Sequence, residues 1–159
     1  MKKITLIQEP YDLTRYELWR NNWSSPSDMT VNDYISDCCH PEDILCSVKL
    51  LIPEFIDIDG CTLLSDRYEE NNFNEWKKQF GTDRAAIEKM LNHVHLYDLF
   101  TGNLDDTSDS VFLQLCKVMQ CSWDMSLKKA FPTKEFVIEI HGSESDYGPS
   151  LTFYQKNRL

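Results

Sequence analysis

The sequence lacks the local motifs that identify many enzymes from a single chain. It contains no Gly-x-Ser-x-Gly elbow, no glycine-rich phosphate loop, no His-Glu-x-x-His and no Cys-x-x-Cys. Each of these patterns places particular side chains at the spacing that one chemistry needs. Local pattern therefore assigns no catalytic residue, no metal ligand and no cofactor, and we expect none.

Long apolar runs, linkers and repeats are also missing. The opening segment has only Ile4–Ile7 as an apolar stretch, which is too short for a secretory signal. No later run approaches the roughly 20 residues of a membrane-spanning helix. No repeat, low-complexity tract or linker divides the chain. We expect a soluble, cytoplasmic protein folded as one domain over residues 1–159, with no membrane partner.

Basic residues are few. The chain has 16 Lys and Arg residues against 26 Asp and Glu residues, a formal net charge of -10. This charge opposes direct binding to nucleic acid or to an anionic membrane. A cationic partner is the natural complement, although acidic charge also keeps an ordinary soluble protein dispersed. The six cysteines are expected to be small buried thiols, not disulfides.

Helical periodicity occupies most of the chain. Asp12 can cap a helix that runs to Trp23, Thr30 with Asp33 resembles a capping box, and Pro41 suits the first position of the next helix. Apolar stripes at helical spacing predict more helices. They are Val31, Tyr34, Ile35 and Cys38; Ile44, Leu45, Val48, Leu51 and Ile52; Phe73, Trp76 and Phe80, ended by Gly81; Ile87, Met90, Leu91 and Val94, opened by Thr82; and Phe112, Leu115, Cys116, Met119, Trp123, Leu127 and Ala130.

Strand signals lie at both ends and in the middle of the chain. Lys3–Gln8 alternates, and Asp59-Gly60 is a strong two-residue hairpin signal within FIDIDGCTLL. Alternation over Phe136–His141 and a second apolar run, Leu151–Tyr154, predict a C-terminal β-hairpin. We expect an α+β fold in which several helices pack on a small, mainly antiparallel sheet.

The stretch DCCHPEDILC, residues 37–46, gathers cysteines and a histidine. We interpret it as the junction of two helices, with Cys38 buried on its stripe, Cys39 and His40 at the corner, and Cys46 facing outward. A structural zinc site would need four convergent ligands, which this arrangement does not provide.

An enzymatic alternative stays open, because a nucleophile and its base can meet only in the fold. It would pair Cys39 or Cys46 with His40, His93 or His95. Since Val94 belongs to a helical stripe, His93 and His95 are not expected to share a face.

Acidic residues cluster in three places. The first two groups are the candidate partner-binding residues: Asp57, Asp59, Asp66, Glu69 and Glu70, and then Asp105, Asp106 and Asp109. The third is Glu144 with Asp146. On one face they would form a negative patch that steers a basic protein, with aromatic neighbours as anchors. The alternative is that these acids only cap helices and solvate loops.

A small, acidic, aromatic-rich chain with no catalytic signature and acidic turns such as DIDG and LDDTSD resembles the immunity proteins of bacterial polymorphic toxin systems, including contact-dependent growth inhibition. The resemblance concerns the overall profile, so it assigns no residue and no fold. It implies binding to one cognate protein toxin, often a basic nuclease, whose active site or substrate groove is blocked. An acidic nucleic-acid mimic that inhibits DNA-binding proteins is a further alternative.

Overall fold

The computed structural model describes residues 2, 4–7, 11–142 and 147–156. It has the α+β class that the sequence predicts. The helices are α1 (Thr14–Arg20), α2 (Val31–Cys38), α3 (Pro41–Leu51), α4 (Glu70–Phe80), α5 (Arg84–Leu91), α6 (Leu96–Leu99) and α7 (Asp109–Ala130). The strands are β1 (Phe55–Ile58), β2 (Cys61–Leu64), β3 (Val94–His95), β4 (Phe136–His141) and β5 (Ser150–Gln155). None of the helices in these ranges is long and apolar enough to cross a membrane.

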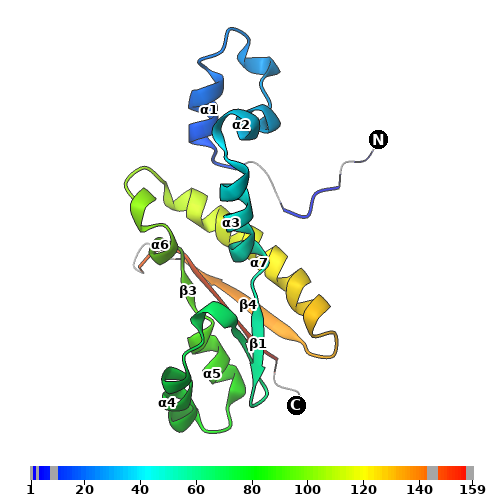
Figure 1. Ribbon diagram of the computed structural model, residues 1–159, viewed down its shortest axis with the longest axis vertical. Helices are drawn as coiled ribbons and strands as arrows, with labels where there is room; N and C mark the ends of the chain where they lie inside the picture. Colours follow the sequence, from blue (N-terminus) through cyan, green and yellow to red (C-terminus); the bar gives the residue numbers. More distant parts are fainter. Residues whose placement is uncertain (1, 3, 8–10, 143–146, 157–159) are drawn as a thin grey trace.

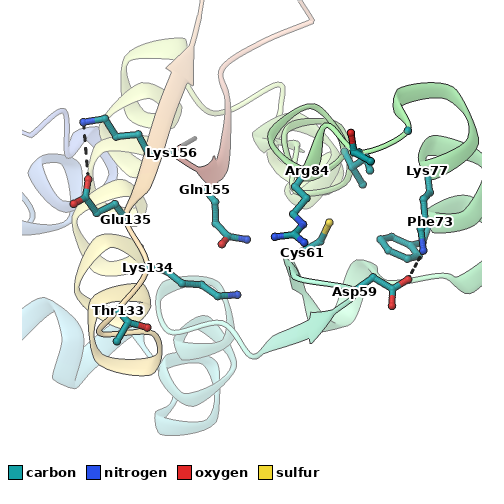
Figure 2. Close-up of a pocket in the computed structure, with 13 residues that line it drawn as sticks. Asp59, Cys61, Phe73, Lys77, Arg84, Thr133, Lys134, Glu135, Gln155 and Lys156 are labelled. Carbon is teal, nitrogen blue, oxygen red and sulfur yellow. Dashed lines mark hydrogen bonds and ion pairs between the residues drawn. The ribbon is translucent and has the colours of Figure 1, made fainter. Parts of the chain in front are cut away.

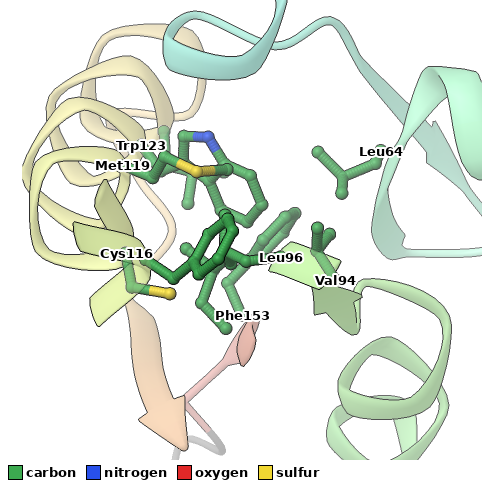
Figure 3. Close-up of a cluster of buried hydrophobic side chains, with 10 residues drawn as sticks. Leu64, Val94, Leu96, Cys116, Met119, Trp123 and Phe153 are labelled. Carbon is green, nitrogen blue, oxygen red and sulfur yellow. The ribbon is translucent and has the colours of Figure 1, made fainter. Parts of the chain in front are cut away.

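The main core lies between the long helix α7 and a three-stranded antiparallel sheet of order β3-β5-β4 (Figure 1). Strands β4 and β5 form the predicted C-terminal hairpin. In this core, Trp123 and Phe153 meet edge to face, with ring centroids 5.8 Å apart (Figure 3). The predicted core face of α7 is largely confirmed, because Phe112, Cys116, Met119, Trp123 and Leu127 are buried. Ala130, the last residue of the helix, is exposed.

A second, smaller core forms where the β1–β2 hairpin packs against α4 and α5. The turn is the predicted one: Asp59 and Gly60 both have positive φ, 51° and 81°, and Ile58 pairs with Cys61. The alternation of side chains along the two strands then sends one face inward. The buried members of this core are Cys61, Leu63, Phe73 and Ile87.

Two buried polar residues, one in α5 and one directly after it, join the two sheets. Asn92, directly after the helix, accepts a hydrogen bond from Leu64 N (2.9 Å) and donates to the carbonyl oxygens of Thr62 (2.9 Å) and Phe153 (3.1 Å). One turn earlier, Glu88 accepts from the backbone N–H groups of Thr62 and Gln155. Both side chains are fully buried. They satisfy backbone groups of β2 and β5 that would otherwise lie unpaired in the interior.

Several element boundaries differ from the sequence predictions. Ile4–Ile7, the described part of the predicted Lys3–Gln8 strand, contains no strand. Helix α1 ends at Arg20, short of Trp23, and Asp12 does not cap it. The Asp12 carboxylate accepts instead from the hydroxyls of Thr14 and Ser108, both at 2.8 Å, which ties the start of α1 to α7.

The helices of the second core also begin and end differently. Helix α4 starts at Glu70, three residues before the predicted stripe begins at Phe73, and Asp83 caps α5 in place of Thr82 by accepting from Ala86 N. Gly81 ends α4 with positive φ, as predicted. Val94 is a strand residue, because α5 stops at Leu91 and the chain then pairs with β5.

Candidate partner-binding surface

The first three helices form a helical arm, residues 12–52, at one end of the molecule. Helices α1 and α2 lie side by side beyond α7, and α3 leads from them to the body (Figure 1). All residues of these helices are described, and none is buried. Helices of 7, 8 and 11 residues are marginal on their own in water, so the arm depends on the contacts described below.

Local signals account for each helix of the arm. The predicted capping box is confirmed: the Thr30 side chain accepts from Asp33 N, and the Asp33 carboxylate accepts from Thr30 N at 2.8 Å. The hydrogen bonds from Thr30 hold the pKa of Asp33 below its ordinary value. Pro41 is the first residue of α3, and His40 caps that helix by accepting from Glu42 N. The junction predicted at Cys39 and His40 is therefore confirmed.

Aromatic side chains hold α1 against α2. Tyr34 meets Tyr16 and Trp19 edge to face, with centroids 5.8 Å and 5.3 Å apart. Trp19 Nε1 donates to Asp37 Oδ2, and the Tyr16 hydroxyl donates to Met29 O, both at 2.8 Å. These contacts use the polar ends of the rings as well as their faces, so the two short helices are fixed to each other.

Two attachments fix the arm to the body. Trp123 Nε1 donates to Leu50 O at 2.7 Å, and the Ser122 hydroxyl donates to Leu51 O. Leu50 and Leu51 pack against the main core. The other attachment is at Asp12, whose backbone N–H donates to Gln114 of α7 at 2.8 Å. Only the last turn of α3 is thus drawn into the core.

The rest of the arm leaves its apolar side chains in solvent. Nine of the 14 exposed large hydrophobic residues of the described chain belong to it. They are Leu13, Leu18, Trp23, Val31, Ile35, Ile44, Leu45, Val48 and Ile52, with exposed fractions of 38% to 69%. Single exposed apolar residues are common, whereas a concentration of them in one part of a protein is typical of an interaction site.

Two of the predicted apolar stripes therefore exist as helix faces but are not buried. On α2, Val31, Ile35 and Cys38 are exposed, and only Tyr34 is half-buried, against α1. On α3, Ile44, Leu45 and Val48 face outward. The prediction that Cys38 is buried is wrong because no element of the described chain covers this side of α2.

The arm is acidic as well as apolar. The arm has seven acidic and three basic residues, so it carries four of the ten excess negative charges of the chain. The acids are Asp12, Glu17, Asp28, Asp33, Asp37, Glu42 and Asp43. Arg20 pairs with Glu17 at 2.8 Å. The arm thus combines exposed apolar area with a net negative charge.

The structure separates the two predicted acidic groups. All eight residues are exposed. The first group, residues 57–70, lies by the β1–β2 hairpin, where Asp57 pairs with Lys134 and Asp59 pairs with Lys77. The second group, Asp105–Asp109, lies beside α6 next to the base of the arm, because Ser108 donates to Asp12. The two groups do not form one patch, and only the second adjoins the arm (Figure 1). Glu144 and Asp146 lie outside the described residues.

Three histidines meet at one end of the three-stranded sheet, contrary to the sequence prediction. His93 and His95 share a face because this stretch is extended, and their rings stack with centroids 4.5 Å apart. The ring centroid of His141, in β4, lies 6.2 Å from that of His93. The pairing register of β3 and β4 on the central strand β5 brings these histidines together, because His95 and His141 both pair with Ser150. Together with Phe80, Met90 and Tyr147 they line a cavity of about 570 Å³.

The surroundings of His93 oppose its protonation. Burial lowers the pKa of His93, and the neighbouring His95 and His141 lower it further. His93 Nε2 and His95 Nδ1 are buried without a hydrogen-bond partner in the described structure. Within residues 4–7, 11–142 and 147–156, no three His, Cys, Asp or Glu residues are placed to hold a metal ion.

The cysteines are not placed to support the enzymatic alternative. No cysteine lines the histidine cavity. Cys46 is exposed on α3, as predicted, and Cys39 is half-buried beside His40, whose Nδ1 accepts from Glu42 N. Burial raises the pKa of Cys61 to about 11 and that of Cys116 to about 12. Thiols with such pKa values are poor nucleophiles at neutral pH.

Comparisons with known proteins add no family to this description. No protein-family model, no curated protein and no solved structure matches the chain significantly. Function is therefore inferred from the chain's own surfaces and cavities.

Proposed function

We propose that this chain is a binding protein that docks a cationic protein through the helical arm, and that the partner is a cognate toxin which it neutralises as an immunity protein. The observation that carries the proposal is the exposed apolar surface of α2 and α3 on an arm with a net negative charge. The toxin as partner, and action in the cytoplasm, rest on the resemblance of the overall profile to immunity proteins.

The two properties of the arm have different roles in binding. Apolar side chains such as Ile44, Leu45 and Val48 would supply most of the affinity, because burying one of them in a contact is worth roughly 1.5–3 kcal/mol. The acids would raise the association rate of a cationic protein and disfavour acidic partners. Asp105, Asp106 and Asp109, which adjoin the base of the arm, would extend the negative surface. Neutralisation would follow from covering the active site or the substrate groove of the toxin.

The occupant is inferred to be a cationic partner and not a second copy of this chain. Two copies would bring two acidic arms together, and like charges across an interface oppose association. A chain that is monomeric by sedimentation agrees with this inference. A stable dimer that the substitution Leu45→Asp converts to a monomer would assign the arm to self-association instead.

The test uses the protein encoded by the gene adjacent to that of this chain. Co-expression should protect cells from that protein, and the association rate should fall as salt is added. Leu45→Asp should weaken binding by about 2 kcal/mol, roughly thirtyfold. The control is Met90→Asp, an exposed apolar residue on α5 at the other end of the molecule, which should bind like the unaltered chain. Absence of protection, or equal loss of binding in both variants, would refute the proposal.

A further inference from the structure

A cleft at the opposite end of the molecule from the helical arm gathers basic side chains within this acidic chain. One wall comes from the β1–β2 turn with α4 and α5, and the other from the segment between α7 and β4 together with the end of β5 (Figure 2). Four basic residues line the cleft: Lys77, Arg84, Lys134 and Lys156. Two acids line it, Asp59 and Glu135. The balance of charge is thus reversed relative to the whole chain, which carries -10.

The exposed guanidinium of Arg84 lines this cleft. It packs against the β1–β2 turn, where a Cβ on Gly60 would lie 2.8 Å from Arg84 Cζ. A glycine with positive φ, 81°, therefore provides the space that the guanidinium occupies. Among the described residues, the Arg84 side chain has no ion pair and no hydrogen bond. Its five N–H donors are available to a ligand.

Lysine ammonium groups add further donors. Lys134 Nζ contacts Asp57 Oδ2 and Thr62 Oγ1, which uses two of its three N–H donors. Lys77 pairs with Asp59, and its ammonium lies 5.8 Å from the centroid of the Phe73 ring. Figure 2 shows Arg84 and Lys134 extending from opposite walls toward the same space, beside Gln155. The lysines are thus positioned by carboxylates on the rim and keep donors for an acceptor in the cleft.

Glu88, a buried carboxylate next to the cleft, already accepts several hydrogen bonds. Glu88 accepts from Thr62 N, from Gln155 N and from Gln155 Nε2. Burial raises its pKa, and these N–H donors oppose the rise. Glu88 therefore joins the two walls of the cleft, and no hydrogen bond links it to Arg84 among the described residues.

We propose that this cleft binds a phosphate-bearing small molecule of nucleotide size, with the phosphate accepting hydrogen bonds from Arg84 and Lys134. The planar fork of a guanidinium matches two phosphate oxygens, and an ammonium adds a point charge. The cavity measures about 760 Å³, within the range of small-molecule sites and larger than a bare phosphate needs. This site is separate from the helical arm, so it does not depend on the function proposed above.

The test is titration of the ¹⁵N-labelled full chain with pyrophosphate and, separately, with AMP. Amide shifts should concentrate at Gly60, Arg84 and Gln155, with a dissociation constant of the order of 1 mM or tighter at low salt. Arg84→Gln should weaken binding at least tenfold. Arg15→Gln, which removes the same charge from an exposed position on α1, should leave binding unchanged. Arg84→Lys should retain part of the affinity, which separates loss of charge from loss of the fork.

Three outcomes would overturn the inference. One is the absence of saturable shifts with either probe. Another is equal weakening by Arg84→Gln and Arg15→Gln, which would indicate binding by charge alone. The last is binding of a single-stranded oligonucleotide much more tightly than of both small probes, which would assign the cleft to a polymer. Thermal unfolding of Arg84→Gln and of the unaltered chain at matched conditions shows whether the variant is folded.

Discussion

Asn92 provides a direct test of how the two sheets are joined. Its amide satisfies one N–H and two carbonyl groups of β2 and β5, and its side chain is fully buried. The substitution Asn92→Leu keeps a side chain of similar size and removes all three hydrogen bonds. The backbone groups of Leu64, Thr62 and Phe153 then lie in the interior without this partner.

The expected cost follows from those three groups. Leaving a buried donor or acceptor unsatisfied costs roughly 1–3 kcal/mol, and partial relaxation reduces the sum, so we expect a loss of about 3–5 kcal/mol. This is a large part of the roughly 5–15 kcal/mol that stabilises a typical domain. At roughly 2–4 °C per kcal/mol for a chain of this size, the melting temperature should fall by about 10 °C.

Urea unfolding followed by tryptophan fluorescence and by circular dichroism measures the effect. The control is Asn74→Leu, the same chemical change at an exposed position of α4, which should alter the free energy of unfolding by less than about 0.5 kcal/mol. If the free energy of unfolding of Asn92→Leu were within about 1 kcal/mol of that of the unaltered chain, the hydrogen bonds of Asn92 would not be what holds the sheets together.

Two further predictions concern titratable side chains. Because the pKa of His93 is lower in the folded chain than its ordinary value of 6.5, the unfolded chain binds the proton more readily. The contribution of neutral His93 to the stability of the fold is complete above pH 6.5. It is lost as the pH falls from 6.5 toward the lowered pKa of His93 in the folded chain. Urea unfolding measures the free energy of unfolding at pH 8 and at pH 5.5. The decrease in this free energy from pH 8 to pH 5.5 should be smaller in His93→Gln than in the unaltered chain, and an identical decrease would contradict the prediction. With a maleimide in native buffer, the exposed thiols of Cys38 and Cys46 should react before the others, and Cys61 and Cys116 should react only on unfolding, because both are buried and have raised pKa values. Mass spectrometry of the labelled peptides checks the order, and early labelling of Cys116 would show that the main core is open.

Some features followed from short-range sequence signals. The Thr30–Asp33 capping box, Pro41 at the start of α3 and the Asp59-Gly60 turn were all predicted, because each depends on residues within four positions of one another. The α+β class and the C-terminal hairpin were predicted from periodicity. These signals act through local backbone geometry, which tertiary contacts left unchanged here.

Candidate site residues were harder to predict because exposure is not a local property. The same periodicity marks a buried stripe on α7 and an uncovered one on α3, since a helix pattern does not say whether another element covers it. The acidic residues were located correctly as exposed. Their neighbours were not foreseen: Asp57 and Asp59 pair with lysines 77 and 18 positions away in the sequence. Such pairing depends on chain packing and cannot be deduced from composition.

The sequence by itself determined most of the helices, the two hairpins and the excess of negative charge, because propensity, turn chemistry and composition are local or additive. Only the tertiary structure decided which apolar faces stay in solvent, how three histidines meet beside Ser150, and how Arg84 and Lys134 come to face one space. Each of these depends on the pairing and packing of segments far apart in the chain. The helical arm and the basic cleft are therefore properties of the fold.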